Sequence, residues 1–327
     1  MNRIKLRLPA APVRCLHPVE LPKLNDIRKA AVRIADEVHS TPVISSATLN
    51  AETSAELFFK CENFQRTGSF KFRGATNAVL SLSEIDSTNG VCTHSSGNHG
   101  AALAAAAAGR GIAAQIVVPE NAAQPKQDSI RRYGGVITHC EPTLEARETM
   151  LAVVQARTGA TFVSPYNDFR IISGQGTAAL ELMDEMDGLD CLIAPVGGGG
   201  LLSGTAIVGN GICVFGAEPK QADDAKRSLD AGEIMPSHPD TIADGLLTSL
   251  GSLTFAVISE NVEDILTVSE TEIIDAMRTV WQRLKIVIEP SSAVALAAVL
   301  RNQEIFAGKR VGVILTGGNV DLSRLPF

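Results

Sequence analysis

The chain has 327 residues, of which 45% are hydrophobic and 20% are charged, and its formal net charge is −7. This length suffices for one large domain or two ordinary ones. An acidic chain without a long basic block is not expected to bind nucleic acid, and its apolar stretches are too short to span a membrane.

Helix and strand patterns alternate along most of the chain. Apolar residues at helical spacing predict helices over 24–39, 98–108, 122–133, 143–157, 175–186, 271–284 and 291–302. Continuous apolar runs predict strands over 56–61, 90–95, 112–118, 135–140, 161–164, 190–196, 212–217 and 310–315. This alternation is typical of an α/β fold, in which helices cover parallel sheets.

The stretch 90–165 forms a compact alternating unit of its own. We therefore expect a small α/β domain, 90–167, that is inserted into a larger domain made of 1–89 and 168–327. Residues 1–19 carry four basic residues and no acidic one, and they lack the apolar segment of a secretory signal. We expect them to be a loose extension.

Six cysteines are scattered without a Cys-X-X-Cys pair: Cys15, Cys61, Cys92, Cys140, Cys191 and Cys213. We interpret them as free thiols in a reducing compartment, which predicts a cytoplasmic protein.

The first stretch that indicates chemistry is GSFKFRG at 68–74, between a predicted strand and a helical pattern. It places Lys71 near the start of a helix. The positive end of the helix dipole and the neighbouring Phe70 and Phe72 favour a neutral amine, which Schiff-base chemistry requires. Taken alone, such a lysine is more often a surface residue whose stem covers apolar neighbours.

A second polar stretch, THSSGNHG at 93–100, ends a predicted strand and opens an alanine-rich helix. Hydroxyl groups, an amide and the N–H groups of a helix start are suited to binding a carboxylate. A helix cap would account for one of these polar residues but not for the whole run, which only Gly97 interrupts. His94 and His99 lack a third ligand at zinc-like spacing.

Four consecutive glycines, Gly197 to Gly200, separate a buried strand from a helix. Without side chains their N–H groups can converge, which favours a phosphate cradle over a flexible turn. A Gly-X-Gly-X-X-Ala pattern at Gly174 is not followed by the acidic residue of a dinucleotide site, so it is more typical of close packing. Thr316 ends the last predicted strand, at the edge where open α/β sheets bind ligands.

A phosphate, an aldehyde for the lysine and a ring near a small hydroxyl together describe pyridoxal phosphate. The chain resembles the fold type II pyridoxal-phosphate enzymes, and within them the serine racemase and threonine/serine dehydratase family, from about residue 24 to 323. The motifs FKCENFQRTGSFKFRGA, SSGNHG, SGQGTAALE, PVGGGGLLSG and TGGNVDL carry this resemblance.

The resemblance implies a role for each motif. Lys71 would form the Schiff base with the cofactor, and Phe70 would pack beside the ring. Asn98 would meet the ring hydroxyl and Thr316 the pyridine nitrogen, where the family often has serine. The phosphate would be bound by Gly197, Gly198, Gly199, Gly200 and the N–H of Leu201. The substrate carboxylate would be held by Ser95, Asn98 and His99.

Two further features resemble the serine racemases in particular. Ser96 stands where those enzymes carry serine and biosynthetic threonine dehydratases carry alanine; it would be a second proton donor, opposite Lys71, unless it only caps the helix. Glu218, Asp224 and the carbonyl of Ala222 resemble a site for Mg²⁺, Ca²⁺ or Mn²⁺. The alternative is a solvated acidic loop.

The sequence thus predicts elimination from L-serine, L-threonine or a close analogue, which yields a 2-oxo acid and ammonia, with serine racemisation by Lys71 and Ser96 as a companion activity. The alternatives are a dedicated serine racemase or a dehydratase of 3-hydroxyaspartate or 3-phenylserine. A β-replacement enzyme and a non-catalytic cofactor-binding protein are more distant rivals. We expect an amino-acid substrate, no nucleic-acid or membrane partner, and, from the resemblance, a homodimer.

Overall fold

The computed structural model describes residues 20–95 and 97–327. The strands are β1 (Val43–Ile44), β2 (Glu56–Cys61), β3 (Val91–His94), β4 (Ala114–Pro119), β5 (Val136–Cys140), β6 (Thr161–Phe162), β7 (Cys191–Pro195), β8 (Cys213–Pro219), β9 (Asp264–Val268) and β10 (Arg310–Leu315). The α-helices are α1 (Leu24–Ile34), α2 (Ala47–Thr53), α3 (Lys71–Leu80), α4 (Glu84–Ser87), α5 (Asn98–Arg110), α6 (Gln124–Arg132), α7 (Leu144–Thr158), α8 (Phe169–Glu185), α9 (Gly200–Val208), α10 (Asp224–Ala231), α11 (Ser252–Asn261), α12 (Glu270–Thr279), α13 (Pro290–Arg301) and α14 (Gln303–Phe306).

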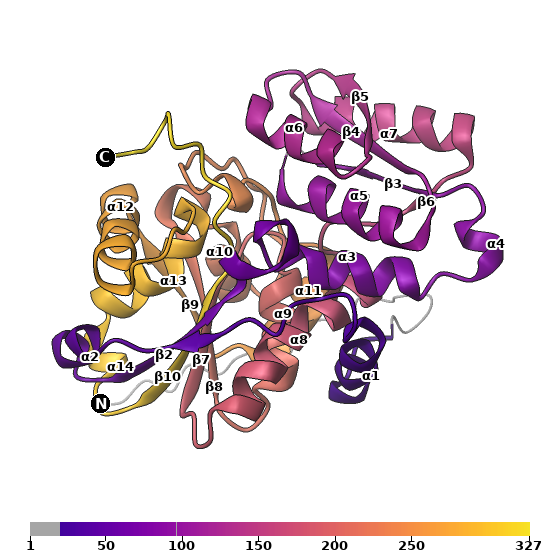
Figure 1. The fold of residues 1–327 in the computed structure, drawn as a ribbon. Coiled ribbons are helices and arrows are strands. Elements are labelled where there is room, and N and C mark those ends of the chain that lie inside the picture. Colours follow the sequence, from indigo (N-terminus) through magenta and orange to yellow (C-terminus); the bar gives the residue numbers. More distant parts are fainter. Residues whose placement is uncertain (1–19, 96) are drawn as a thin grey trace, which may run out of the picture.

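The strands form two separate sheets (Figure 1). The six-stranded sheet has the order β1-β2-β10-β7-β8-β9, and all its pairs are parallel except β1 with β2. Its centre is β10, where Val313 pairs with Phe59 on one side and with Ile193 on the other. The four-stranded sheet, β5-β4-β3-β6, is parallel throughout. The carboxyl ends of the parallel strands in each sheet therefore meet at one edge.

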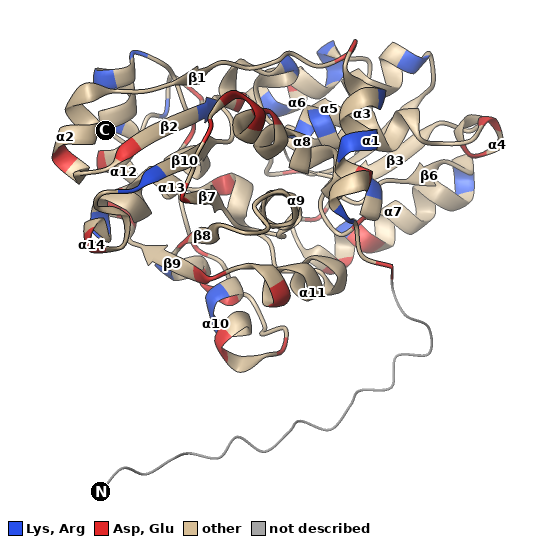
Figure 2. Ribbon diagram, turned by 90° about the horizontal axis from the view of Figure 1, so that it is seen from below, with Lys and Arg blue, Asp and Glu red and all other residues tan. Residues whose placement is uncertain are grey.

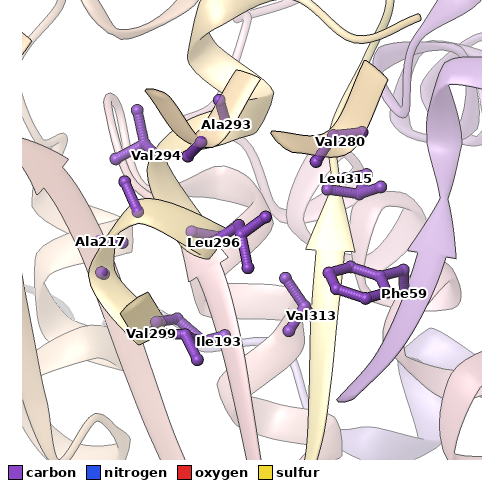
Figure 3. Packing of buried hydrophobic residues seen from close by; sticks show 14 of the residues in the cluster. Phe59, Ile193, Ala217, Val280, Ala293, Val294, Leu296, Val299, Val313 and Leu315 are labelled. Atoms are coloured by element: carbon purple, nitrogen blue, oxygen red, sulfur yellow. The ribbon is translucent and has the colours of Figure 1, made fainter. Parts of the chain in front are cut away.

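Helices cover both faces of the six-stranded sheet. On one face α13 lays Leu296 and Val299 against Phe59, Ile193 and Val313 (Figure 3). On the other face residues of α1, α8, α9 and α11 form a second apolar cluster with β7, β8 and β10. Because both faces are buried, these strands read as continuous apolar runs in the sequence.

A third apolar cluster packs α3, α5 and α8 against the four-stranded sheet. It is made largely of alanines from α3 and α5, with Ile116 of β4 and Ile171 of α8. Small side chains let helices approach closely, so the helix that begins at Lys71 lies beside the helix that begins at Asn98. This packing brings two of the sequence motifs to one place.

The α/β pattern predicted from the sequence is confirmed, with shifts at element ends. Helix α8 begins at Phe169, well before the predicted start at 175, and Gly174 and Gly176 lie inside it. A Cβ on Gly174 would lie 2.6 Å from the Cα of Gly74, and one on Gly176 would lie 3.1 Å from the Cα of Gly204. Both glycines therefore serve close helix packing, as expected. The domain boundaries near 90 and 167 stay a prediction.

Five cysteines are free in the described part of the chain, and all but Cys213 are buried; Cys15 and the expected N-terminal extension lie outside it. Within the described residues no helix is long and apolar enough to cross a membrane. Acidic and basic residues are interspersed along the elements (Figure 2).

Candidate active site

A cavity of about 370 Å³ lies where the carboxyl ends of strands from both sheets face each other. Of the cofactor and substrate residues expected from the sequence, the structure places these along the cavity: Phe70, Lys71, Ser95, Asn98, His99, Gly197, Gly198, Gly199, Gly200, Leu201 and Thr316. Ser96 lies outside the described residues. The three expected metal ligands do not line this cavity.

Lys71 is the first residue of α3, as the sequence indicated. Its Nζ donates a hydrogen bond to the carbonyl of Pro165 at 2.9 Å and lies 5.2 Å from the centre of the Phe70 ring. Burial lowers the pKa of Lys71 to about 8, although the carboxylate of Glu289 opposes the shift. A substantial fraction of the amine is therefore neutral near physiological pH, as nucleophilic and proton-abstracting lysines require.

The glycine loop has the properties of an anion cradle. The N–H groups of Gly197 to Leu201 have no hydrogen-bond acceptor among the described residues, and Gly200 begins α9. Gly199 has a φ of +87°, in the left-handed region that favours glycine. Unpaired amides at a helix start attract a phosphate through hydrogen bonds and the helix dipole.

Tyr166 closes one side of the glycine loop. A Cβ on Gly198 would lie 2.2 Å from Cγ of the Tyr166 ring, so the glycine is required by this contact as well as by the free amides. The Tyr166 hydroxyl pairs with Thr248 Oγ1 at 3.2 Å. Tyr166 was not expected here from the sequence, because it belongs to no motif.

The start of α5 offers a second anion site. Ser95 Oγ accepts hydrogen bonds from the N–H groups of Gly97 and Gly100, at 3.3 and 3.1 Å. Its own O–H hydrogen has no acceptor among the described residues, nor do the backbone N–H groups of Asn98 and His99. These three donors suit a carboxylate.

His99 remains neutral. Burial and the neighbouring Lys71 charge lower its pKa to about 3. Nε2 lies 3.3 Å from the carbonyl oxygen of Val163, so that nitrogen carries the proton, and Nδ1 is buried without a hydrogen-bond partner among the described residues. The ring N–H is thus occupied, and the backbone N–H of His99 is the donor left for a ligand.

Glu289 is a site residue that the sequence did not reveal. It immediately precedes α13, is 2% exposed and lines the cavity. Its Oε1 accepts a hydrogen bond from Asn98 Nδ2 at 2.8 Å, whereas its Oε2 is buried with no partner among the described residues. Burial raises the pKa of Glu289, and the nearby Lys126 ammonium opposes the shift. In the sequence, the Pro that follows indicates only a helix start.

Two more cations line the cavity. Lys126 of α6 forms an ion pair with Asp244. Arg147, in the first part of α7, forms no ion pair with a carboxylate of the described residues, and its Nε is buried without a hydrogen-bond partner. Burial and the Arg147 charge lower the pKa of His94 beside it, so His94 adds no positive charge. Arg147 is therefore an uncompensated cation at the cavity.

The loops around the cavity are tied to one another through the backbone. Phe70 N–H donates to the carbonyl of Thr316 at 3.0 Å, and Gly318 N–H donates to the carbonyl of Gly68 at 3.0 Å. Thr316 itself is 4% exposed and lines the cavity. The end of β10 thus holds the segment that precedes Lys71.

The expected metal ligands gather elsewhere, at the end of β8. Glu218 and Asp224 are both buried, and burial raises the pKa of each, that of Glu218 to about 9. Glu218 accepts hydrogen bonds from two backbone N–H groups and Asp224 from Ser237. In the described residues no group of three or more His, Cys, Asp or Glu side chains is arranged to hold a metal ion. The metal site formed by these two carboxylates and the Ala222 carbonyl therefore stays a prediction.

The cavity fits pyridoxal phosphate by its chemistry. It combines an amine of lowered pKa, a row of free amides at a glycine loop, and a buried carboxylate oxygen without a partner. The amine would serve the aldehyde and the amides the phosphate, while the carboxylate of Glu289 accepts from the Asn98 amide, which would face the polar edge of the ring.

Comparison with known proteins agrees with this chemistry. The family model described as "Pyridoxal-phosphate dependent enzyme" matches residues 34–317. The β-hydroxyaspartate dehydratase of Paracoccus denitrificans is 53% identical over 312 residues, which cover 94% of this chain and 99% of the relative.

Two solved structures share the fold. The crystal structure of serine racemase from Dictyostelium discoideum is 50% identical, with a TM-score of 0.88, and the match covers 92% of this chain and 99% of that one. A pyridoxal 5′-phosphate-dependent aspartate racemase is 36% identical, also with a TM-score of 0.88, over 95% and 99% of the two chains. The architecture is that of fold type II, and the chain belongs to the family of pyridoxal-phosphate dependent enzymes.

Proposed function

We propose that the protein is a pyridoxal-phosphate dependent ammonia-lyase that converts a 3-hydroxy amino acid with an acidic side chain, 3-hydroxyaspartate, to a 2-oxo acid and ammonia. The proposal that the substrate has an acidic side chain rests on Arg147, a cation at the cavity without a carboxylate partner among the described residues. The name of the Paracoccus relative and that of the aspartate racemase support the same substrate class.

The cofactor would be held by residues from several loops. Lys71 would bond to its aldehyde carbon, and Phe70 would pack beside the ring. Asn98 would meet the ring hydroxyl, and the Thr316 hydroxyl would face the ring nitrogen. The phosphate would lie on the N–H groups of Gly197 to Leu201. When bound, pyridoxal phosphate supplies an electron sink for negative charge at the substrate α-carbon.

The remaining chemistry belongs to the side chains of the chain itself. Lys71, as the neutral amine, takes the α-proton, and the carbonyl of Pro165 orients its Nζ. The Ser95 hydroxyl and the N–H groups of Asn98 and His99 bind the α-carboxylate. Arg147 binds the second carboxylate, for which a guanidinium offers two parallel donors. This contact selects 3-hydroxyaspartate over L-serine and L-threonine.

The test compares substrates on the holoenzyme. We expect kcat/KM for 2-oxo acid formation to be highest with 3-hydroxyaspartate. Arg147→Met should lower that value by roughly 10- to 150-fold, because a charged hydrogen bond contributes about 1.5–3 kcal/mol, and it should leave the value for L-serine within about threefold. Equal losses on both substrates, or a wild-type preference for L-serine, would refute the acidic substrate.

Serine racemisation is the second candidate activity, and it rests on Ser96 and on the serine racemases among the relatives. Holoenzyme is incubated with L-serine and Mg²⁺, and pyruvate and D-serine are measured together. If Ser96 donates the second proton, Ser96→Ala lowers D-serine formation more than pyruvate formation. Equal loss of both products would mean that Ser96 caps the helix or binds substrate.

We further propose that Glu218, Asp224 and the Ala222 carbonyl bind a divalent cation such as Mg²⁺. Two buried carboxylates with raised pKa values, neither of which forms a salt bridge with a described residue, support an oxygen-liganded cation there. A homodimer and a cytoplasmic location complete the proposal, on the strength of the sequence resemblance and the free cysteines.

A further inference from the structure

Asn98 lies within a series of hydrogen-bonded side chains beside the cavity. Its Oδ1 accepts from Asn319 Nδ2 at 3.0 Å, and its Nδ2 donates to Glu289 Oε1 at 2.8 Å. Asn319 Nδ2 also donates to the backbone carbonyl of Thr67 at 2.7 Å. The amides of Asn319 and Asn98 therefore link four separate segments of the chain.

The direction of this chain of hydrogen bonds is fixed by the backbone. The carbonyl of Thr67 can only accept, so the Asn319 atom that faces it must be the NH₂ group. The same NH₂ group faces Asn98, so the Asn98 atom opposite it must be the oxygen. The Asn98 NH₂ group then points at Glu289, which offers an oxygen acceptor. No other assignment of the two amides satisfies all three contacts.

The carbonyl that sets this direction stands in an unusual backbone. Thr67 has a φ of +63° and Gly68 a φ of +76°. A threonine in the left-handed region costs conformational free energy. Such a backbone conformation persists only where the surrounding contacts require it. A Cβ on Gly68 would lie 2.4 Å from Asn319 Oδ1, so Gly68 gives Asn319 the room to reach the carbonyl. The turn before Lys71 is thus shaped around Asn319.

We infer that Asn319 and Glu289 are positioning residues that fix the orientation of the Asn98 amide, so that one N–H of its NH₂ group faces the cofactor. One Asn98 N–H is used by Glu289, and the other has no acceptor among the described residues and is at the cavity. An N–H donor favours the deprotonated form of the ring hydroxyl, whereas a rotated amide would present its oxygen and favour the protonated form. This inference rests on the proposed contact between Asn98 and the ring hydroxyl.

The test measures bound cofactor rather than turnover. Asn319→Asp keeps the size of the side chain but replaces the donor by a carboxylate, which accepts from Asn98 Nδ2 and rotates the amide. We expect its absorbance and fluorescence to change towards the form with a protonated ring hydroxyl, and its cofactor dissociation constant to rise at least about tenfold. Asn302→Asp is the matched control, since Asn302 Nδ2 also donates to a backbone carbonyl but lies away from the cavity.

A second pair of variants tests the hydrogen bond between Asn98 and Glu289. Glu289→Gln retains an oxygen acceptor for Asn98 and should keep the wild-type spectrum, while Glu289→Leu removes it and should change the spectrum. This pair decides the question if Asn319→Asp fails to fold. Identical spectra for Glu289→Gln and Glu289→Leu would overturn the inference.

Asn98→Ala separates the inference from the cofactor contact on which it rests. If Asn98→Ala changes the spectrum but Asn319→Asp does not, the positioning role is refuted while the proposed contact stands. If Asn98→Ala itself has the wild-type spectrum, the contact with the ring hydroxyl is wrong, and the positioning role falls with it.

Discussion

Replacing Gly198 by alanine should weaken cofactor binding, although alanine keeps every backbone amide of the cradle. The added Cβ would lie 2.2, 2.3 and 2.5 Å from Cγ, Cδ1 and Cδ2 of Tyr166. Non-bonded carbons settle at about 3.5–4.0 Å, so the ring or the loop must move by more than about 1 Å.

Neither side of this contact can move freely. The Tyr166 hydroxyl is paired with Thr248, and the carbonyl of Gly198 accepts from Thr254 Oγ1 at 2.8 Å. Overpacking of this kind costs about 1–3 kcal/mol. If the loop yields and the cradle is distorted, the cofactor dissociation constant rises by roughly 5- to 150-fold.

The assay is titration of apoprotein with pyridoxal phosphate, followed by absorbance. Gly109→Ala is the control, because that glycine lies inside α5 with its nearest neighbour 3.8 Å from a built Cβ, and alanine there should leave binding unchanged. Tyr166→Ala in the Gly198→Ala background should restore affinity. Wild-type affinity in Gly198→Ala, or no recovery in the double variant, would refute the steric reasoning.

Three further predictions follow from burial and charge. The pKa of Lys71 is lowered to about 8, so the rate of cofactor uptake by apoprotein should rise with pH around 8, as the ammonium loses its proton; a midpoint near the usual 10.5 would contradict this. Arg73→Met should lower the free energy of unfolding in urea by about 3–5 kcal/mol, because Glu62, 2.7 Å away and fully buried, loses its partner; a loss below about 1 kcal/mol would contradict it. Mg²⁺ should raise the melting temperature of the wild type but not of Glu218→Gln, and equal shifts would exclude the proposed cation site.

The sequence predicted most of the fold because buried parallel strands leave continuous apolar runs between helical patterns. It missed β9 (Asp264–Val268), in which polar residues interrupt a short run. It also placed the start of α8 too late, since Gly174, just before the predicted start, argues against a helix by propensity, although Gly176 lay inside the predicted range. Those glycines are compatible with the helix because each gives a neighbouring backbone room to pack closely. That compensation is a tertiary effect and is invisible in the local sequence.

The residues of the candidate site likewise fall into those that the sequence predicted and those that it did not. Residues in loops directly after strands were predicted, since parallel strands deliver them to one edge of the sheet. Glu289, Tyr166 and Lys126 were not predicted, because they belong to no motif and reach the cavity only through the packing of α13, the segment after β6, and α6. The sequence analysis assigned no role to Arg147, because its lack of an acidic partner among the described residues is visible only in three dimensions.

The sheet from which each site residue comes explains why the Asn98 side chain is held by two hydrogen bonds. The other proposed cofactor residues follow strands of the six-stranded sheet, whereas the proposed substrate donors, Ser95 and Arg147, come from elements of the four-stranded sheet. Asn98 is the exception, a proposed cofactor contact that begins α5. Any movement between the two sheets would displace it from a ring held by the other side. Its hydrogen bonds to Asn319 and Glu289, both from the six-stranded side, resist that displacement.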